Sequence, residues 1–151
     1  MTEEFAGQCQ CGEAKSRVTG TAADPFCLSL HGVSAPIGER IRIGAVAKRA
    51  DIQLLSGALK EWVRTTPLGK RMACRFCPTC GTRVFHQMLG QSAIMSIKPD
   101  TLNDTKGLEP VAHIWTASKQ SWLEIPAGTL QFQEGPTNFE EIFCAWAQAH
   151  A

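Results

Sequence analysis

Apolar and polar residues alternate along several short stretches of the chain, and Gly or Pro interrupts most of them. The stretches GERIRIGAVAK (38–48) and GTRVFHQM (81–88) alternate with a period of two residues, which is typical of an antiparallel strand with one buried face. Ten segments have strand-like composition: Ala14–Thr19, Pro25–Leu30, Arg40–Val46, Asp51–Leu55, Leu59–Thr65, Met72–Phe76, Arg83–Met88, Ala93–Ile97, Val111–Trp115 and Leu130–Gln133. Short strands at such spacing predict an assembly of β-sheets.

The last segment of the chain follows a different period. Its apolar residues recur at i, i+3, i+4 and i+7, and they are Phe139, Ile142, Phe143 and Trp146. This pattern predicts one helix over Phe139–Ala149 with a single apolar stripe. Thr137 and Asn138 stand before two glutamates, which is an N-cap signal. The stripe predicts a helix docked on the sheet, although it could also contact a second subunit in a homodimer. Cys144 lies off the stripe.

Composition and charge narrow the class of protein. The 151 residues fit one domain over residues 1–151, and 44% hydrophobic with 19% charged residues allow a packed core. The net charge is +1 with scattered basic residues, which does not favour nucleic-acid binding. No apolar run reaches the ~18 residues of a membrane span, and the acidic start MTEEFAGQCQCG lacks the apolar core of a signal peptide. We therefore expect a cytoplasmic protein, with no membrane partner.

Seven cysteines in a reducing compartment point first to metal binding or catalysis. In CPTCG, the proline sets the turn and the glycine tolerates a positive φ, so Cys77 and Cys80 could hold one ion. Cys9 and Cys11 in GQCQCGE are two positions apart, and on an extended strand their side chains would share a face. Together the two pairs supply the four thiolates of a closed structural zinc site.

The wide separation of the two pairs does not argue against a shared metal. Closing such a loop costs about 4 kcal/mol, whereas a structural zinc contributes on the order of 10–16 kcal/mol. A thioredoxin-like redox pair would be followed by a helix, but the alternating GTRVFHQM follows here. A disulfide between Cys9 and Cys11 would be strained. The zinc would tie the first strands to the middle of the chain.

Three motifs make the chain resemble a known family. GQCQCGEAKSRVTG, FCPTCGTRVF and AHIWTASKQSWLEI are similar, in order and spacing, to the glutathione-dependent formaldehyde-activating enzyme family, also called the centromere protein V domain, over about residues 5 to 134. The resemblance implies a mainly β fold of stacked antiparallel sheets with few helices, clamped by a structural zinc. The period of the last segment adds a C-terminal helix to this prediction. It also implies carbon–sulfur lyase chemistry, in which the thiol of glutathione adds to formaldehyde to give S-hydroxymethylglutathione.

The resemblance further implies two zinc ions. The residues matching the structural zinc are Cys9, Cys11, Cys77 and Cys80. A Cys-x-Cys-x-x-Cys run holds the family's proposed catalytic zinc, and the matching stretch here is FCLSLHGVSAP. Cys27 fits the first ligand, but Ser29 and Gly32 stand at the second and third positions. Because thiolate number controls the affinity for soft metals, this second site cannot form in the family's usual way.

Other residues could rebuild the second site. His31 follows Cys27 by four residues, and Cys74 adjoins the structural pair without belonging to it. A cluster of Cys27, His31 and Cys74 with an open position would suit catalysis. The alternative is that the three side chains have only packing or surface roles, as most free cysteines do. Cys27 could also act as a nucleophile without metal, if a partner such as His31 lowered its pKa.

Alternation places His113 and Trp115 on one face of a strand, with Ile114 on the other. Either they pack in the core, or they form with His31 the wall of a substrate pocket near the second metal position, as the resemblance suggests. His86 reads as a structural strand residue. Two functions remain open: a zinc-dependent enzyme acting on glutathione or another small thiol adduct, and a non-catalytic binding protein that keeps only the zinc scaffold.

Overall fold

The computed structural model describes residues 2–21, 27–31, 42–66 and 68–151. For residues 27–31 the description concerns the backbone alone, and Gly32 lies outside the described residues. Within these ranges the chain forms two β-sheets, three short 3-10 turns and one α-helix. The mainly β fold class with a C-terminal helix is therefore confirmed.

The smaller sheet contains three antiparallel strands in the order β1-β2-β5. The strands are β1 (Thr2–Gln8), β2 (Lys15–Thr21) and β5 (Ile52–Ser56). The sequence analysis did not predict β1, because its acidic stretch TEEFAGQ lacks alternation. Pairing with β2 along the whole strand, with Phe5 opposite Val18, holds it in place.

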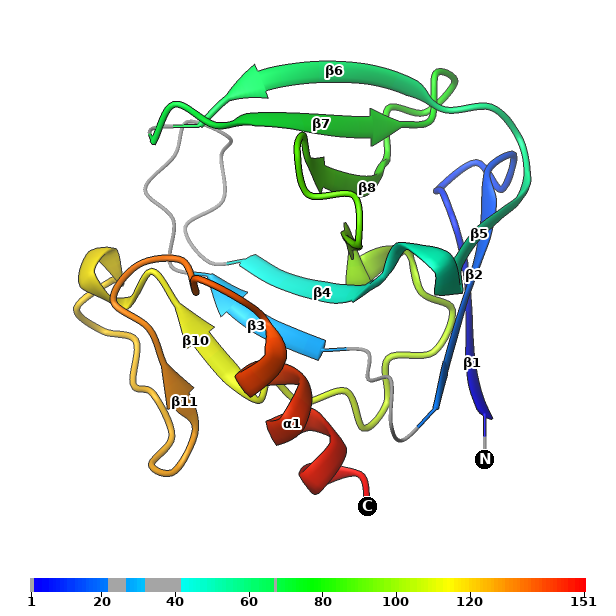
Figure 1. Ribbon diagram of the computed structural model, residues 1–151. Coiled ribbons are helices and arrows are strands. Elements are labelled where there is room, and N and C mark those ends of the chain that lie inside the picture. Colours follow the sequence, from blue (N-terminus) through cyan, green and yellow to red (C-terminus); the bar gives the residue numbers. More distant parts are fainter. Residues whose placement is uncertain (1, 22–26, 32–41, 67) are drawn as a thin grey trace.

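The larger sheet has eight strands in the order β11-β10-β3-β4-β9-β8-β7-β6 (Figure 1). They are β3 (Cys27–His31), β4 (Arg42–Lys48), β6 (Lys60–Thr65), β7 (Arg71–Phe76), β8 (Arg83–Met88), β9 (Ile94–Ile97), β10 (Ala112–Ile114) and β11 (Leu130–Gln131). Its strands are antiparallel, except that β10 runs parallel to both β3 and β11. Each of the ten predicted segments overlaps one observed strand of the two sheets, with ends that differ by up to two residues.

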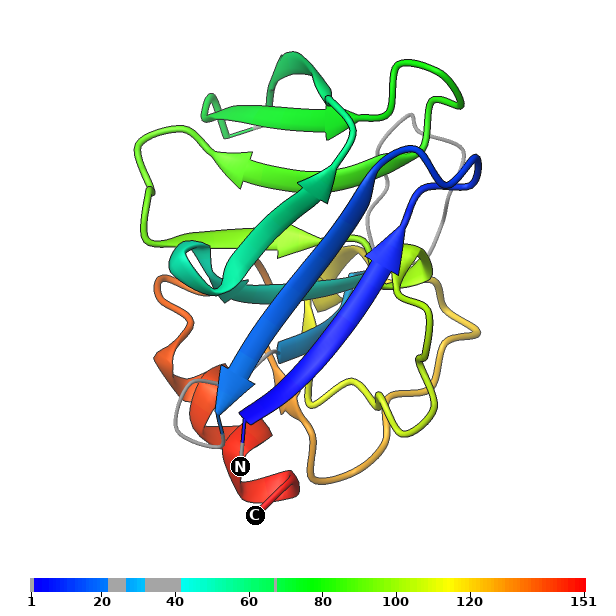
Figure 2. The ribbon, with the colours of Figure 1, turned by 90° about the vertical axis from the view of Figure 1, so that its right-hand side faces the viewer.

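Figure 2 shows β1 and β2 of the small sheet lying across the strands of the large one. The main core cluster contains residues from both sheets, among them Val18 of β2, Phe85 of β8 and Ile97 of β9. Because Val84, Phe85 and His86 are consecutive and all buried, both faces of β8 are covered. The prediction of a half-buried strand from GTRVFHQM was therefore wrong: Val84 and Phe85, which point to opposite faces of β8, both belong to the main core cluster.

The helix α1 (Glu140–Ala149) begins one residue later than predicted. Phe139 is the N-cap residue and makes no side-chain cap hydrogen bond, so the predicted cap at Thr137 and Asn138 lies outside the helix. The side-chain oxygen of Asn138 still accepts a hydrogen bond from the backbone N–H of Glu140 at 3.1 Å. Ile142 is fully buried and packs with Ala112 and Ile114 of β10. The helix is therefore docked on the sheet, whereas Cys144 is exposed.

Three 3-10 turns complete the described elements, namely η1 (Arg49–Asp51), η2 (Pro99–Thr101) and η3 (Thr116–Ser118). The longest described helix is α1 with 10 residues. No described helix combines the length and the apolar character that crossing a bilayer requires.

Candidate metal centre

The first cysteine pair lies in the turn between β1 and β2. The Gly12 N–H donates to the Cys9 carbonyl at 3.0 Å, and the Cys9 N–H donates to the Ala14 carbonyl at 2.9 Å. Gly12 has a φ of 80°, a left-handed conformation that favours glycine. Cys9 and Cys11 lie in a turn rather than on a slightly bent extended strand as predicted, because these hydrogen bonds bend the chain directly after β1. The bend still brings both thiols to one side.

The second pair lies in the turn between β7 and β8, as the CPTCG motif predicted. The Gly81 N–H donates to the Cys77 carbonyl at 2.9 Å, and Gly81 has a φ of 75°. The Cys77 N–H donates to the carbonyl of Thr82 at 2.9 Å. The turn is thus closed at both ends, and this fixes the directions of the Cys77 and Cys80 side chains.

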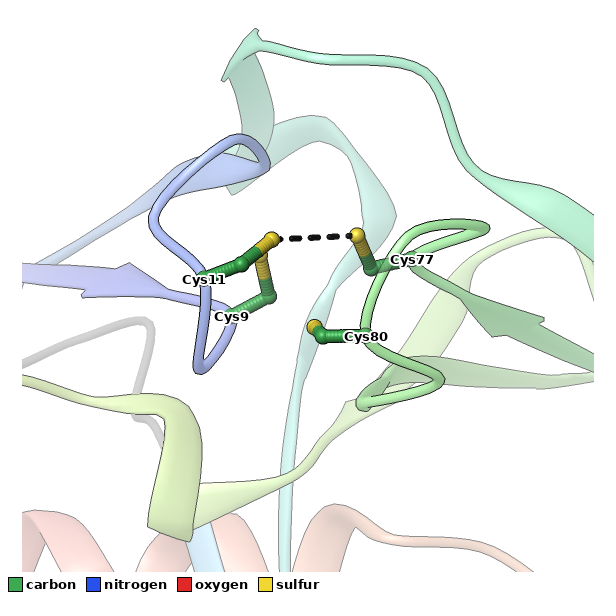
Figure 3. A group of neighbouring side chains, drawn as sticks. All are labelled: Cys9, Cys11, Cys77 and Cys80. Carbon is green, nitrogen blue, oxygen red and sulfur yellow. Dashed lines mark hydrogen bonds between the residues drawn. The ribbon is translucent and has the colours of Figure 1, made fainter.

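The two turns bring all four predicted thiols together (Figure 3). The Sγ atoms of Cys9, Cys11, Cys77 and Cys80 lie within 4.8 Å of one another. The Sγ atoms of Cys9 and Cys11 are 3.4 Å apart, and those of Cys11 and Cys77 are 3.7 Å apart. A disulfide would need about 2.05 Å, whereas four sulfurs at 2.3 Å from a tetrahedral zinc are about 3.8 Å apart. The cluster therefore fits a four-coordinate metal ion.

The electrostatics of the thiols also suit a cation. Hydrogen bonds from Thr82, first its side chain and then its backbone, lower the pKa of Cys80 to about 5. The Glu13 backbone lowers the pKa of Cys11, but burial and the neighbouring thiols outweigh it and raise this pKa to about 12. Burial raises the pKa of Cys9, yet hydrogen bonds led by the Ala14 N–H lower it overall. Close thiols cannot all ionise unaided, and a bound zinc would compensate the charge of all four thiolates.

Hydrogen bonds hold the two turns against each other. The Gln10 N–H donates to Thr82 Oγ1 at 3.2 Å, and the Thr79 hydroxyl donates to the Glu13 carboxylate at 2.6 Å. Sequence reasoning missed these residues, because polar contacts between distant turns leave no periodic signal. The first turn belongs to the small sheet and the second to the large one, so a metal ion here would connect the two sheets.

The turn after β5 packs directly against the first cysteine turn. Gly57 has a φ of 80°, and a Cβ atom at this position would lie 2.6 Å from the Glu13 carbonyl oxygen and 2.8 Å from the Ala14 Cα. Glycine is therefore required here for two reasons, its backbone conformation and the close approach of another segment. The sequence shows the glycine but not the neighbour that makes it necessary.

The predicted second metal cluster of Cys27, His31 and Cys74 stays a prediction. Cys27 and His31 are the end residues of β3, for which the backbone alone is described, while Cys74 lies fully buried on β7. Three strands, β4, β9 and β8, separate β3 from β7 in the sheet. Since neighbouring strands are about 4.8 Å apart, the sheet order does not favour Cys74 as a ligand shared with β3.

His113 is buried on β10, next to β3. It pairs with Leu30, whereas Ser29 and His31 pair with Ala112 and Ile114. Its side chain is 6% exposed, and its Nδ1 atom has no hydrogen-bond partner among the described residues. Burial lowers the pKa of His113, which favours a neutral imidazole.

Trp115 does not continue the predicted strand. β10 ends at Ile114, and Trp115 adopts a left-handed conformation with a φ of 58°. The expected alternation with His113 therefore stops before Trp115, because the chain turns into η3 at this point. His86 is a buried strand residue of β8, opposite Cys74, which agrees with its predicted structural role.

Comparison with known proteins adds three findings. A crystal structure of a Rhodobacter sphaeroides protein is 20% identical, with a TM-score of 0.48, and the similarity covers 87% of this chain and 99% of that one. No curated protein matches the sequence. The family model described as glutathione-dependent formaldehyde-activating enzyme matches residues 4–118, which include all four clustered cysteines and most of the 151 residues. The chain therefore belongs to the glutathione-dependent formaldehyde-activating enzyme family.

Proposed function

We propose that this protein holds one structural zinc ion on Cys9, Cys11, Cys77 and Cys80. The observation that carries the proposal is the convergence of four sulfurs, all within 4.8 Å, from turns of two different sheets. Thiolate ligands favour zinc among the common divalent ions of the cell. The set of four leaves no open coordination position, so this metal contributes stability rather than chemistry.

We further propose that the reaction of formaldehyde with glutathione is slow or absent in this protein. The family's second zinc is held by three cysteines, and the matching positions here are Cys27, Ser29 and Gly32. An open-site zinc acts by polarising a bound oxygen and by lowering the pKa of a bound water or thiol. Losing both effects removes several kcal/mol of transition-state stabilisation, and each ~1.4 kcal/mol is a factor of ten in rate.

We also propose that the chain keeps one part of the family's role, the binding of a small thiol compound such as glutathione or its adduct. His113 supports this proposal, because its Nδ1 atom is buried without a partner among the described residues and β10 pairs directly with β3. A buried polar atom without a partner is costly in a purely structural position. A ligand beside β3 could supply the missing hydrogen bond.

Metal content and reaction rate together test the proposal. The purified protein should contain one zinc per chain by mass spectrometry of the metal. The rate of S-hydroxymethylglutathione formation, followed by NMR exchange spectroscopy, should be close to the uncatalysed rate. The proposal that the second zinc site is lost would be overturned by two zinc ions per chain together with a reaction rate like that of a relative that keeps all three cysteines of this site.

Substitutions then locate any activity that is found. If Cys27→Ala and His31→Ala each abolish an observed acceleration, these two residues form a rebuilt site. If neither substitution changes it, the chemistry lies elsewhere in the molecule, and the argument from Ser29 and Gly32 fails.

A further inference from the structure

Thr82 contacts both halves of the cysteine cluster through one hydroxyl group. Its Oγ1 atom lies 3.1 Å from the Sγ of Cys80 and 3.2 Å from the backbone nitrogen of Gln10. Gln10 stands between the two cysteines of the first turn, whereas Cys80 belongs to the second turn. The carbonyl of Thr82 also accepts the Cys77 N–H at 2.9 Å, so this residue touches both turns.

The chemistry of these groups sets the direction of the hydrogen bonds. The Gln10 N–H can only donate, so Thr82 Oγ1 accepts this bond. The single hydroxyl proton of Thr82 is then free to point at Cys80, and an ionised sulfur can accept it. A hydroxyl that donates to a thiolate makes a charge-assisted bond, which is stronger than a neutral one.

We propose that Thr82 is a positioning residue for the zinc site, because its hydroxyl group lies between the Cys80 sulfur and the backbone of the first cysteine turn and orients Cys80 toward the metal. The inference rests on the proposed zinc function. Partners of this kind, outside the ligand set, orient the ligands and typically change metal affinity 10–100-fold when they are removed.

The chain offers a matched control for the experiment. Thr79 lies in the same turn, and its hydroxyl links the same two turns by donating to Glu13 at 2.6 Å, but this contact involves no sulfur. If Thr82 acted only by tethering the turns, Thr79→Val would have the same effect as Thr82→Val. Valine replaces threonine with nearly the same volume, so both variants remove one hydroxyl and little else.

The test compares metal affinity in the full-length wild type, Thr82→Val, Thr82→Ser and Thr79→Val proteins. Competition with a chromophoric chelator should show zinc dissociation constants 10–100-fold higher for Thr82→Val. Thr82→Ser keeps the hydroxyl and should restore the wild-type affinity, and Thr79→Val should stay near the wild type. Should Thr82→Val not fold, Thr82→Ala, which removes the hydroxyl without adding apolar surface, takes its place.

The absorption spectra of the cobalt-substituted proteins give a second measurement. Their charge-transfer band would not change if Thr82 had a purely structural role. Losing a hydrogen bond raises the energy of the sulfur donor electrons, so the sulfur-to-cobalt charge-transfer band should move to longer wavelength in Thr82→Val alone. Unchanged affinity and an unchanged band in Thr82→Val would overturn this inference and leave the zinc site intact. Equal effects in Thr82→Val and Thr79→Val would also overturn it. A wild-type protein that binds no metal would overturn the proposed function itself.

Discussion

At the scale of single residues, the buried imidazole of His113 makes the free energy of unfolding depend on pH. The imidazole is buried on β10, and burial lowers its pKa from the ordinary value of 6.5. The unfolded chain therefore binds the His113 proton at a higher pH than the folded chain does. The stability that neutral His113 contributes is present above pH 6.5 and is lost as the pH falls through its lower folded pKa.

Replacing His113 with Phe should accordingly make the protein less sensitive to acid. Phenylalanine keeps a ring of similar size, and it removes both the titration and the Nδ1 atom, which has no hydrogen-bond partner among the described residues. Urea denaturation at pH 7.5 and pH 5.5 should show a smaller loss of unfolding free energy in His113→Phe than in the wild type. Zinc release by acid affects both proteins alike, so equal losses would contradict the argument.

At the scale of elements, the turns on either side of β6 differ in one informative way. Gly57 before the strand and Gly69 after it both have a positive φ, 80° and 77°. A Cβ on Gly57 would meet the backbone of the first cysteine turn, but a Cβ on Gly69 would meet nothing within 4 Å. Substituting each glycine with alanine therefore separates two contributions to the unfolding free energy, one from the backbone conformation and one from close packing.

Gly69→Ala should destabilise the protein by about 1–2 kcal/mol, the cost of a left-handed non-glycine residue. Gly57→Ala should cost about 1–3 kcal/mol more, because its methyl group would push the cysteine turn away. It should also weaken zinc binding, since the displaced turn carries two of the ligands. Chemical denaturation and chelator competition measure both effects, and equal values for the two variants would refute the role of packing.

Local patterns in the sequence were enough to predict most strands, the helix, and which four cysteines lie together. Alternation and breakers located ten strands, and the i, i+3, i+4 stripe located α1, because these signals lie within a few residues. β1 was missed since its acidic sequence becomes a strand only through pairing with β2. The parallel pairing of β10 with β3 and the contacts of Thr82 depend on which distant segments meet, and a period along the chain does not carry that information.

At the scale of the whole molecule, the cysteine cluster joins two sheets that otherwise share the main core. Zinc binding is therefore expected to be part of folding, with its free energy added to the free energy of unfolding. Replacing one of the four cysteines would leave three thiols close together without the proposed zinc ion to compensate their charge. We therefore expect such a substitution to lower the stability of the whole fold and not only that of the two turns.

Cys77→Ser should lose zinc and lower the melting temperature by at least about 10 °C, with aggregation on heating. Cys77 is 1% exposed, and serine is a poor zinc ligand. Cys144→Ser is the matched control, because this thiol is exposed and lies outside the cluster. It should change stability by no more than about 0.5 kcal/mol. A zinc-free Cys77→Ser protein with wild-type melting would refute the structural role of the metal.

The distance along the chain between the two cysteine turns also has a consequence for biosynthesis. Cys11 and its partner Cys77 are 66 residues apart, and a ribosome adds roughly 5–20 residues per second. The first two thiols thus wait several seconds in the nascent chain before Cys77 and Cys80 are made. During that interval they are open to oxidation and to the wrong metal, so we expect assembly of the proposed zinc site to depend on the reducing power of the surrounding medium while the chain is still growing.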